Sequence, residues 1–173
     1  LLAEEITPFL HRIPNNRNGR PLAWLGSSGL QPLDPDVARF LKLENQAGLV
    51  VSEILEGSPA AAAGLHERDI LLTLDGEALP LLKPDRVLVA FLDREINRRI
   101  PGDILRMGVL RDGQHIEIKA LLTDAPELPQ EAPRRYFEDL GLSVRGFTYV
   151  DGVARKLKVS EHRGVIAHFV KPN

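Results

Sequence analysis

The segment from residue 48 to residue 76 constrains the fold of this chain more than any other part. It opens with a run of apolar and β-branched residues at positions 49–55, which has the length of a β-strand. Ser58 is suited to cap the N-terminus of a helix, and Pro59 suits the first helical position, where its missing N–H costs nothing. Four alanines follow, and Gly64 can adopt the left-handed conformation that ends a helical turn. A strand and one small helix are therefore predicted.

The chain continues with alternating strand and helix signals. A second strand is predicted at residues 70–74 and stops at the turn pair 75–76. Residues 86–98 have a strong helical pattern, and residues 104–110 have the pattern of a strand. The segment 111–114, Arg-Asp-Gly-Gln, is the sharpest hairpin signal and predicts an antiparallel return strand. The order predicts an α+β fold.

Upstream of the central unit, four shorter elements are predicted. They are a short amphipathic helix at 3–12, a turn-rich break at 14–20, a first strand at 22–31, and one or two helical turns at 35–43.

Part of the pattern returns after a proline-rich, acidic linker at residues 124–134. Residues 139–144 echo 24–27, and residues 164–170 echo the first strand of the central unit. The offsets agree, at 115 (141 − 26) and 116 (164 − 48). Residues 135–173 are therefore predicted to be the N-terminal part of a second copy, which lacks the alanine-rich helix, the long helix and the final hairpin.

Composition narrows the functional classes. The chain has 173 residues, 43% of them hydrophobic and only 5% aromatic, so aliphatic side chains must fill its core. A net charge of −2 provides no general attraction for nucleic acid or an anionic membrane surface. No apolar run approaches the roughly 20 residues that span a bilayer, so we expect no direct membrane insertion. The chain has no cysteine. It begins with Leu and shows no secretory signal, so we expect it to be part of a longer protein.

Catalytic and metal-binding patterns are weak. Gly26-Ser27-Ser28-Gly29 is a superficial match to a serine nucleophile loop, but it falls on a predicted strand. The five histidines, at positions 11, 66, 115, 162 and 168, do not have the spacing of metal ligands. We expect no catalytic residue, no metal and no cofactor in this chain, and an autonomous hydrolase is set aside.

Four motifs together resemble a PDZ domain of the kind attached to HtrA/Deg-type trypsin-like serine proteases. They are Trp24-Leu25-Gly26-Ser27, the Gly-Ser-Pro-Ala block at 57–60, Asp69 to Gly76, and Pro101 to Gly113. The resemblance implies an α+β fold, a small, partly open β-barrel or sandwich with two helices. It divides the chain into a connector helix and turn (1–20), a first PDZ domain (21–123), a linker (124–134) and part of a second PDZ-like unit (135–173).

The implied function is peptide capture by β-augmentation, in which an extended peptide adds a strand to a sheet edge. The peptide would pair with the edge from Ser27 to Leu30 and lie against the helix at 86–98. Its terminal carboxylate would be held by the backbone amides of the turn. The candidate peptide-binding residues are Trp24, Leu25, Gly26, Ser27, Ser28, Leu30, Leu88, Phe91 and Leu92. Two alternatives stay open, since the apolar run at 87–92 can be entirely core or an inter-domain contact, and Trp24 can be a packing residue.

Two hypotheses concern the glycine turns. Gly26 is expected to let the backbone approach an anion, so Gly26→Val should abolish peptide capture and leave the fold largely intact. In the second copy, Asp139 stands where the first has Trp24. Its charge would repel a carboxylate, so we expect the second unit to bind C-termini poorly.

The resemblance implies a non-catalytic, regulatory segment of a serine endopeptidase that serves protein quality control. The implied partners are peptides or C-termini of unfolded proteins, the chain's own protease domain and further copies in a homo-oligomer. The implied location is periplasmic or otherwise extracytoplasmic. The alternative is a scaffold or assembly module that holds an oligomer or secretion complex together without binding free peptides.

Overall fold

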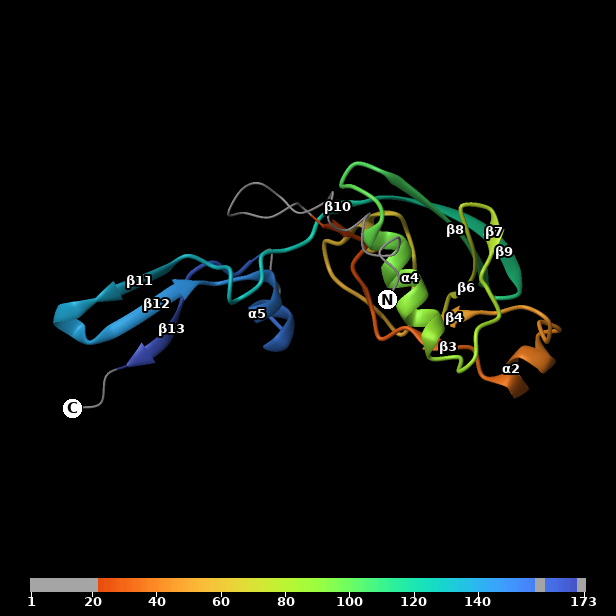
Figure 1. Cartoon of the computed structure of the whole chain (residues 1–173), viewed down its shortest axis with the longest axis horizontal. Coiled ribbons are helices and arrows are strands. Elements are labelled where there is room, and N and C mark those ends of the chain that lie inside the picture. Colours follow the sequence, from red (N-terminus) through yellow and green to blue (C-terminus); the bar gives the residue numbers. More distant parts are fainter. Residues whose placement is uncertain (1–21, 158–160, 171–173) are drawn as a thin grey trace, which may run out of the picture.

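The computed structural model describes residues 22–157 and 161–170. Figure 1 shows the chain in two parts, a larger α+β domain and a smaller C-terminal part that projects from it. The helix predicted at 3–12 and the break predicted at 14–20 lie outside the described residues. None of the described helices is both long and apolar enough to cross a bilayer.

The larger domain is built on an open antiparallel sheet. Its strands follow the order β3-β4-β6-β8-β9, and β7 pairs with β6 beside this path. The strands are β3 (Gln31–Pro32), β4 (Leu49–Val50), β6 (Ile70–Leu74), β7 (Glu77–Ala78), β8 (Ile104–Arg111) and β9 (Gln114–Leu121). The hairpin predicted at 111–114 joins β8 to β9. The sheet is not closed into a barrel, which confirms the partly open α+β fold.

Two short ladders flank this sheet. One ladder is the pair of β1 (Ala23–Trp24) and β10 (Thr123–Asp124). The other is the pair of β2 (Ser27–Ser28) and β5 (Glu53–Ile54). The single strand predicted at 22–31 is thus divided into β1, β2 and β3. The division occurs at Gly26 and Gly29, whose φ angles of 79° and 61° turn the chain out of extended geometry. Asp124, the first residue of the predicted linker, still belongs to a ladder of the domain.

Three helices complete the domain: α2 (Pro35–Phe40), α3 (Pro59–Ala62) and α4 (Val87–Asn97). The predicted start of α3 is confirmed, because the Ser58 hydroxyl accepts a hydrogen bond from the Ala61 amide and Pro59 is the first helical residue. Gly64 has a φ of 79°, as the prediction of a left-handed end requires. Helix α4 agrees with the predicted span to within one residue at each end.

The hydrophobic core lies between α4 and the sheet. Leu88, Leu92 and Ile96 of α4 are buried in one hydrophobic cluster with apolar side chains of β8 such as Leu105 and Met107. A second, smaller cluster lies elsewhere in the domain, where Ile70, Leu72 and Leu110 pack against Leu33, Leu41, Leu43 and Val50. In the apolar run at 87–92, Leu88 and Leu92 are buried and Val89 and Phe91 pack against the core, whereas Val87 and Ala90 are exposed. The run is therefore not entirely core.

The C-terminal part contains a three-stranded antiparallel sheet in the order β11-β12-β13. Its elements are β11 (Arg134–Phe137), the 3₁₀ helix η1 (Glu138–Leu140), β12 (Leu142–Gly146), α5 (Tyr149–Ala154) and β13 (Val165–Val170). Helix α5 lies at the end of this part that faces the larger domain (Figure 1).

The turn into α5 is held by a buried ion pair. The Asp151 carboxylate accepts hydrogen bonds from the Arg145 guanidinium and from the Thr148 amide and hydroxyl. These bonds outweigh the opposing effect of burial and hold the pKa of Asp151 well below its usual range. The side chains of Thr148 and Asp151 also complete a capping box, which fixes where α5 begins.

Candidate functional site

Two hydrogen bonds, one from α3 and one from the residue after β5, hold the turn between β1 and β2 in place. The Leu25 carbonyl accepts from the Ala60 amide of α3 at 2.9 Å. The Gly26 carbonyl accepts from the Leu55 amide, just after β5, at 3.0 Å. Because both carbonyls are engaged on this side, the turn has a defined orientation with respect to the domain core.

The amides of the same turn are available. Within the described residues, the N–H groups of Leu25 and Gly26 donate to no backbone carbonyl. Gly26 has a left-handed φ of 79°, and successive backbone amides around such a residue can form a concave binding site for an anion. Among the described residues, the turn therefore combines carbonyls that accept hydrogen bonds with amides that donate none to the backbone.

A pocket of about 230 Å³ lies between this turn and α4. One wall comes from Ala23, Trp24, Leu25 and Ser27, and the other from Asp93, Ile96 and Asn97. The three α4 residues have helical spacings of three and four, so they share one face of the helix. A ligand in this pocket would contact both the free amides and the C-terminal half of α4.

The candidate residues of the sequence divide into two groups. Trp24, Leu25 and Ser27 line the pocket, and Gly26 lies in the turn. Leu88 and Leu92 have only 3% and 1% of their surface exposed, and Phe91 and Leu30 are partly buried against the core. Ser28 lies beside a different cleft.

The sequence reasoning missed Asp93, Ile96 and Asn97. Their positions follow from helical periodicity, which separates them from the buried residues Leu88 and Leu92. A face with two polar side chains has the pattern of a solvated surface, and only the neighbouring turn makes it the wall of a pocket.

The hypothesis that Gly26→Val leaves the fold intact is wrong. A Cβ atom at Gly26 would lie 2.1 Å from the Ser58 Cβ, far inside van der Waals contact. The missing side chain is thus required by the packing of the turn on the start of α3, in addition to the positive φ.

Of the described residues that line this pocket, Asp93 alone is acidic. Partial burial raises the pKa of its carboxyl group, because desolvation disfavours the charged form. In the described part of the chain it forms no ion pair. A ligand carboxylate in the pocket would meet this group, so Asp93 gives the site a pH-sensitive charge.

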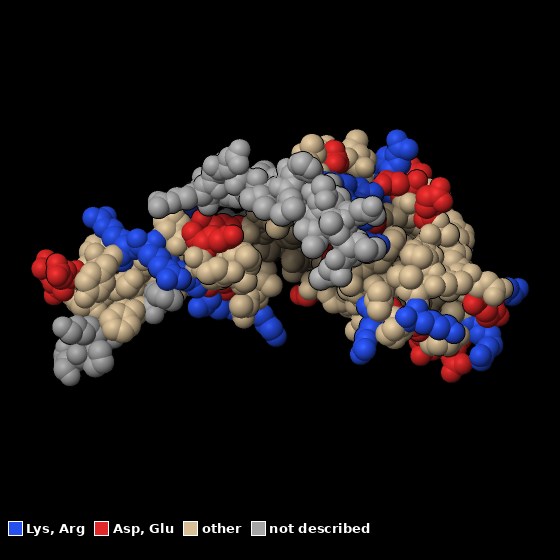
Figure 2. Space-filling view, in the orientation of Figure 1, with Lys and Arg blue, Asp and Glu red and all other residues tan. Residues whose placement is uncertain are grey.

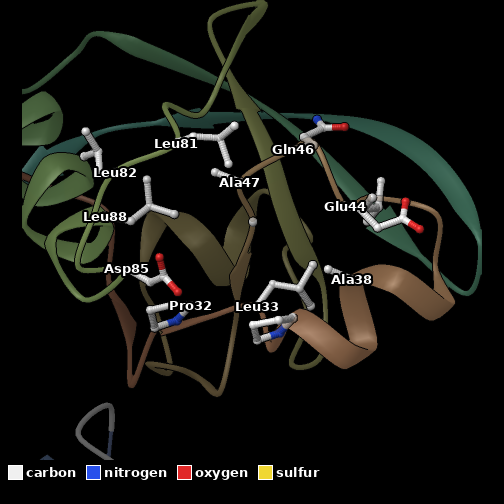
Figure 3. Close-up of a pocket in the computed structure, with 13 residues that line it drawn as sticks. Pro32, Leu33, Ala38, Glu44, Gln46, Ala47, Leu81, Leu82, Asp85 and Leu88 are labelled. Atoms are coloured by element: carbon white, nitrogen blue, oxygen red, sulfur yellow. The ribbon is translucent and has the colours of Figure 1, made fainter.

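A second, smaller hollow of about 160 Å³ lies at the other end of α4. Figure 3 shows Asp85 and Leu88 on one side of it, with Pro32, Leu33 and Ala38 on the side of β3 and α2. It shares no lining residue with the pocket at the turn. Helix α4 therefore has one hollow near each end.

The visible face of the larger domain carries charges of both signs, and Figure 2 shows acidic and basic side chains interspersed over it. Basic residues gather instead over the C-terminal sheet, where Arg134 and Arg135 of β11 are exposed. No group of three or more His, Asp or Glu side chains in the described residues could hold a metal ion.

An open antiparallel sheet, a helix beside it and a glycine turn with free amides define the fold and site of a PDZ domain. The family model of the PDZ domain matches residues 26–92. The chain contains a PDZ domain similar to those of HtrA-type proteases, as its curated relatives and its structural neighbours agree. This confirms the resemblance found in the sequence.

Two curated relatives illustrate the match. A DegP-like periplasmic serine endoprotease of Chlamydia pneumoniae is 29% identical over 144 residues, which cover 83% of this chain and 27% of the relative. The periplasmic pH-dependent serine endoprotease DegQ of Escherichia coli is 30% identical over 128 residues, covering 74% of this chain and 25% of DegQ. The chain thus spans about a quarter of the length of these relatives.

Solved structures support the same grouping. The HtrA-type protease AlgW with a tripeptide superposes with a TM-score of 0.58 and 25% identity, covering 74% of this chain and 40% of AlgW. A substituted form of AlgW with a decapeptide gives a TM-score of 0.55 and 27% identity, covering 76% of this chain and 36% of the other.

Proposed function

We propose that this chain is the peptide-binding, regulatory part of a periplasmic HtrA-type serine endoprotease, and that it captures the C-termini of extended peptides. The pocket between the Gly26 turn and α4 carries the proposal, since it joins free backbone amides to an apolar floor at Ile96. Terminal carboxylates bind to such amides, and an apolar last side chain would rest on Ile96.

Strand β2 supplies the edge for β-augmentation. Within the described residues it pairs only with β5, so its second edge is open to another strand. The similar AlgW structures are complexes with a tripeptide and with a decapeptide, which supports peptide binding by this fold. The contacts we propose are Trp24, Leu25, Gly26 and Ser27 on one side and Asp93, Ile96 and Asn97 on the other.

Peptide titration tests this function. Decapeptides that end in an apolar residue, with a free or an amidated C-terminus, are titrated against the whole chain by calorimetry. We expect the free acid to bind more tightly, because only a carboxylate uses the turn amides. Equal affinity for the two forms, or no binding, would reject the proposal.

A pair of variants localises the site. Asn97→Phe places a large side chain in the pocket from an exposed helix position and should abolish binding. Arg98→Phe makes the same change at the next exposed residue, which does not line the pocket, and should leave the affinity unchanged. If both variants bind like the wild type, the peptide lies elsewhere.

We further propose that residues 135–173 are the N-terminal part of a second PDZ-like unit. The order of strand, left-handed glycine turn, strand, helix and strand occurs in both parts of the chain, with Gly26 in the first turn and Gly141 in the second. Asp139 lies in η1, directly before that second turn. Poor binding of carboxylates by the second unit therefore stays a prediction.

We also propose a location, a neighbouring domain and an oligomeric state for this chain. The curated relatives are named as periplasmic serine endoproteases, which supports an extracytoplasmic location and a neighbouring protease domain for this chain. Assembly into a homo-oligomer is proposed on the same ground. If peptide binding fails and the chain self-associates in analytical ultracentrifugation, the scaffold function takes its place.

A further inference from the structure

Trp24 lines two separate hollows. Besides the pocket at the turn, it lines a cleft of about 500 Å³ between the PDZ domain, the linker and the C-terminal part. Leu22, Ser28 and Leu55 line this cleft from the domain, and Tyr149, Val150 and Val153 line it from α5. Trp24 therefore lines both the proposed peptide site and the inter-unit cleft.

The indole of Trp24 contacts both the glycine turn and α5. Its Cζ2 atom lies 3.1 Å from the position that a Cβ on Gly26 would occupy, so the ring packs closely on the glycine turn. The ring of Tyr149 meets the indole edge to face, with a centroid distance of 5.3 Å and an interplanar angle of 77°. Trp24 is thus in contact with the Gly26 turn and with Tyr149 of α5.

A second contact leads from Tyr149 to the same turn. The Tyr149 hydroxyl donates a hydrogen bond of 2.8 Å to the Glu56 carbonyl. The residue before Glu56, Leu55, donates its amide to the Gly26 carbonyl. Burial and the nearby Glu56 and Glu53 raise the pKa of Tyr149, so its hydroxyl remains a neutral donor. Two separate routes therefore connect Tyr149 to Gly26.

We propose that Tyr149 is a positioning residue for the peptide site of the preceding PDZ domain. By holding Trp24 and the Glu56 carbonyl, α5 fixes the turn whose amides receive the terminal carboxylate, and this pre-organisation strengthens peptide binding. Because linkage is reciprocal, a bound peptide should in turn stabilise the docking of α5. The proposal rests on the proposed function and adds a regulatory role for the second unit.

The composition of the chain provides a direct probe. Trp24 is the single tryptophan, and Tyr136 and Tyr149 are the two tyrosines. The emission spectrum of the whole chain therefore reports the surroundings of Trp24 without a label. Tyr136, on β11 and 54% exposed, offers a matched control for changes at Tyr149.

We expect Tyr149→Ala to shift the emission of Trp24 to longer wavelengths, because the indole becomes more exposed. The variant should bind a free-acid decapeptide with an apolar last residue about two- to tenfold more weakly, as loss of an aromatic pair predicts. Tyr149→Phe keeps the ring and should lose less affinity. Tyr136→Ala should change neither the emission nor the affinity.

Hydrogen exchange tests the reciprocal effect. Saturating decapeptide should slow amide exchange in α5 of the wild type, and it should not do so in Tyr149→Ala. A shifted emission with wild-type affinity would show that Tyr149 only packs on Trp24, and it would overturn the inference while the peptide site stands. Absence of peptide binding by the wild type would reject the proposed function and this inference with it.

Discussion

The backbone of Gly26 packs directly on Ser58, with a Cβ–Cβ separation of 2.1 Å for any residue that replaced the glycine. Ser58 is fully buried and its hydroxyl caps α3. The turn that presents the free amides is therefore built on the start of the small helix. The shape of the proposed peptide site and the stability of the domain should depend on the same contact.

Gly26→Ala should destabilise the domain more than an equally strained glycine substitution. Gly113 has the same φ of 79°, but nothing lies within 4 Å of its missing Cβ. Gly113→Ala should cost about 1–2 kcal/mol for the left-handed backbone. Gly26→Ala should cost about 1–3 kcal/mol more because of overpacking against Ser58. Urea unfolding measures both, and equal losses would contradict the clash.

The ion pair between Asp69 and Arg111 should make stability fall in acid. Burial of Asp69 opposes its charged form, but hydrogen bonds from Arg111 and the His66 amide outweigh burial and lower the pKa of Asp69. A lowered pKa stabilises the fold above the unfolded value of 3.8, and this contribution disappears as the pH falls toward the folded pKa.

Asp69→Asn should therefore lower the unfolding free energy at pH 7 by about 3 kcal/mol, as for a broken buried ion pair. It should also flatten the dependence of stability on pH below about 4. The exposed Asp36→Asn, whose pair with Arg39 lies on the surface, is the control and should change the stability by less than about 1 kcal/mol. If the stability of Asp69→Asn falls in acid as steeply as that of the wild type, Asp69 is not the source of the acid sensitivity.

Peptide affinity should rise as the pH falls, through the protonation of Asp93. Above its raised pKa this carboxylate is charged and faces the terminal carboxylate of the ligand, which weakens binding. Asp93→Asn should bind a free-acid peptide more tightly at pH 7 and lose this part of the pH dependence. An amidated peptide lacks the opposing charge and should respond less to the substitution. If both peptides respond alike, Asp93 acts through the fold.

Leu92→Ala should affect stability and leave the affinity of the folded protein unchanged. Leu92 is 1% exposed in the core, so truncation should cost about 2–5 kcal/mol. Val87→Ala, on the same helix and 42% exposed, should cost within about 0.5 kcal/mol. Chemical denaturation and peptide titration separate the two effects. A large loss of affinity in folded Leu92→Ala would restore this residue to the binding site.

Local signals in the sequence predicted most of the helices and strands. The cap at Ser58, the left-handed Gly64 and the hairpin at 111–114 depend on residues close together in the chain, and the structure has all three. The prediction of one continuous strand at 22–31 was wrong. The positive φ at Gly26 and Gly29 depends on packing, which local sequence patterns do not contain.

The sequence alone determined the family, the α+β fold and the turn at Trp24-Leu25-Gly26-Ser27, since these depend on short motifs and hydrophobic periodicity. Only the tertiary structure decided which face of α4 meets that turn: Asp93, Ile96 and Asn97 line the pocket there, whereas Leu88 and Leu92 are buried. It also brought Tyr149 to Trp24, residues far apart in the chain. The physical reason is that a wide apolar stripe and a distant aromatic pair acquire a role only when packing decides what they touch.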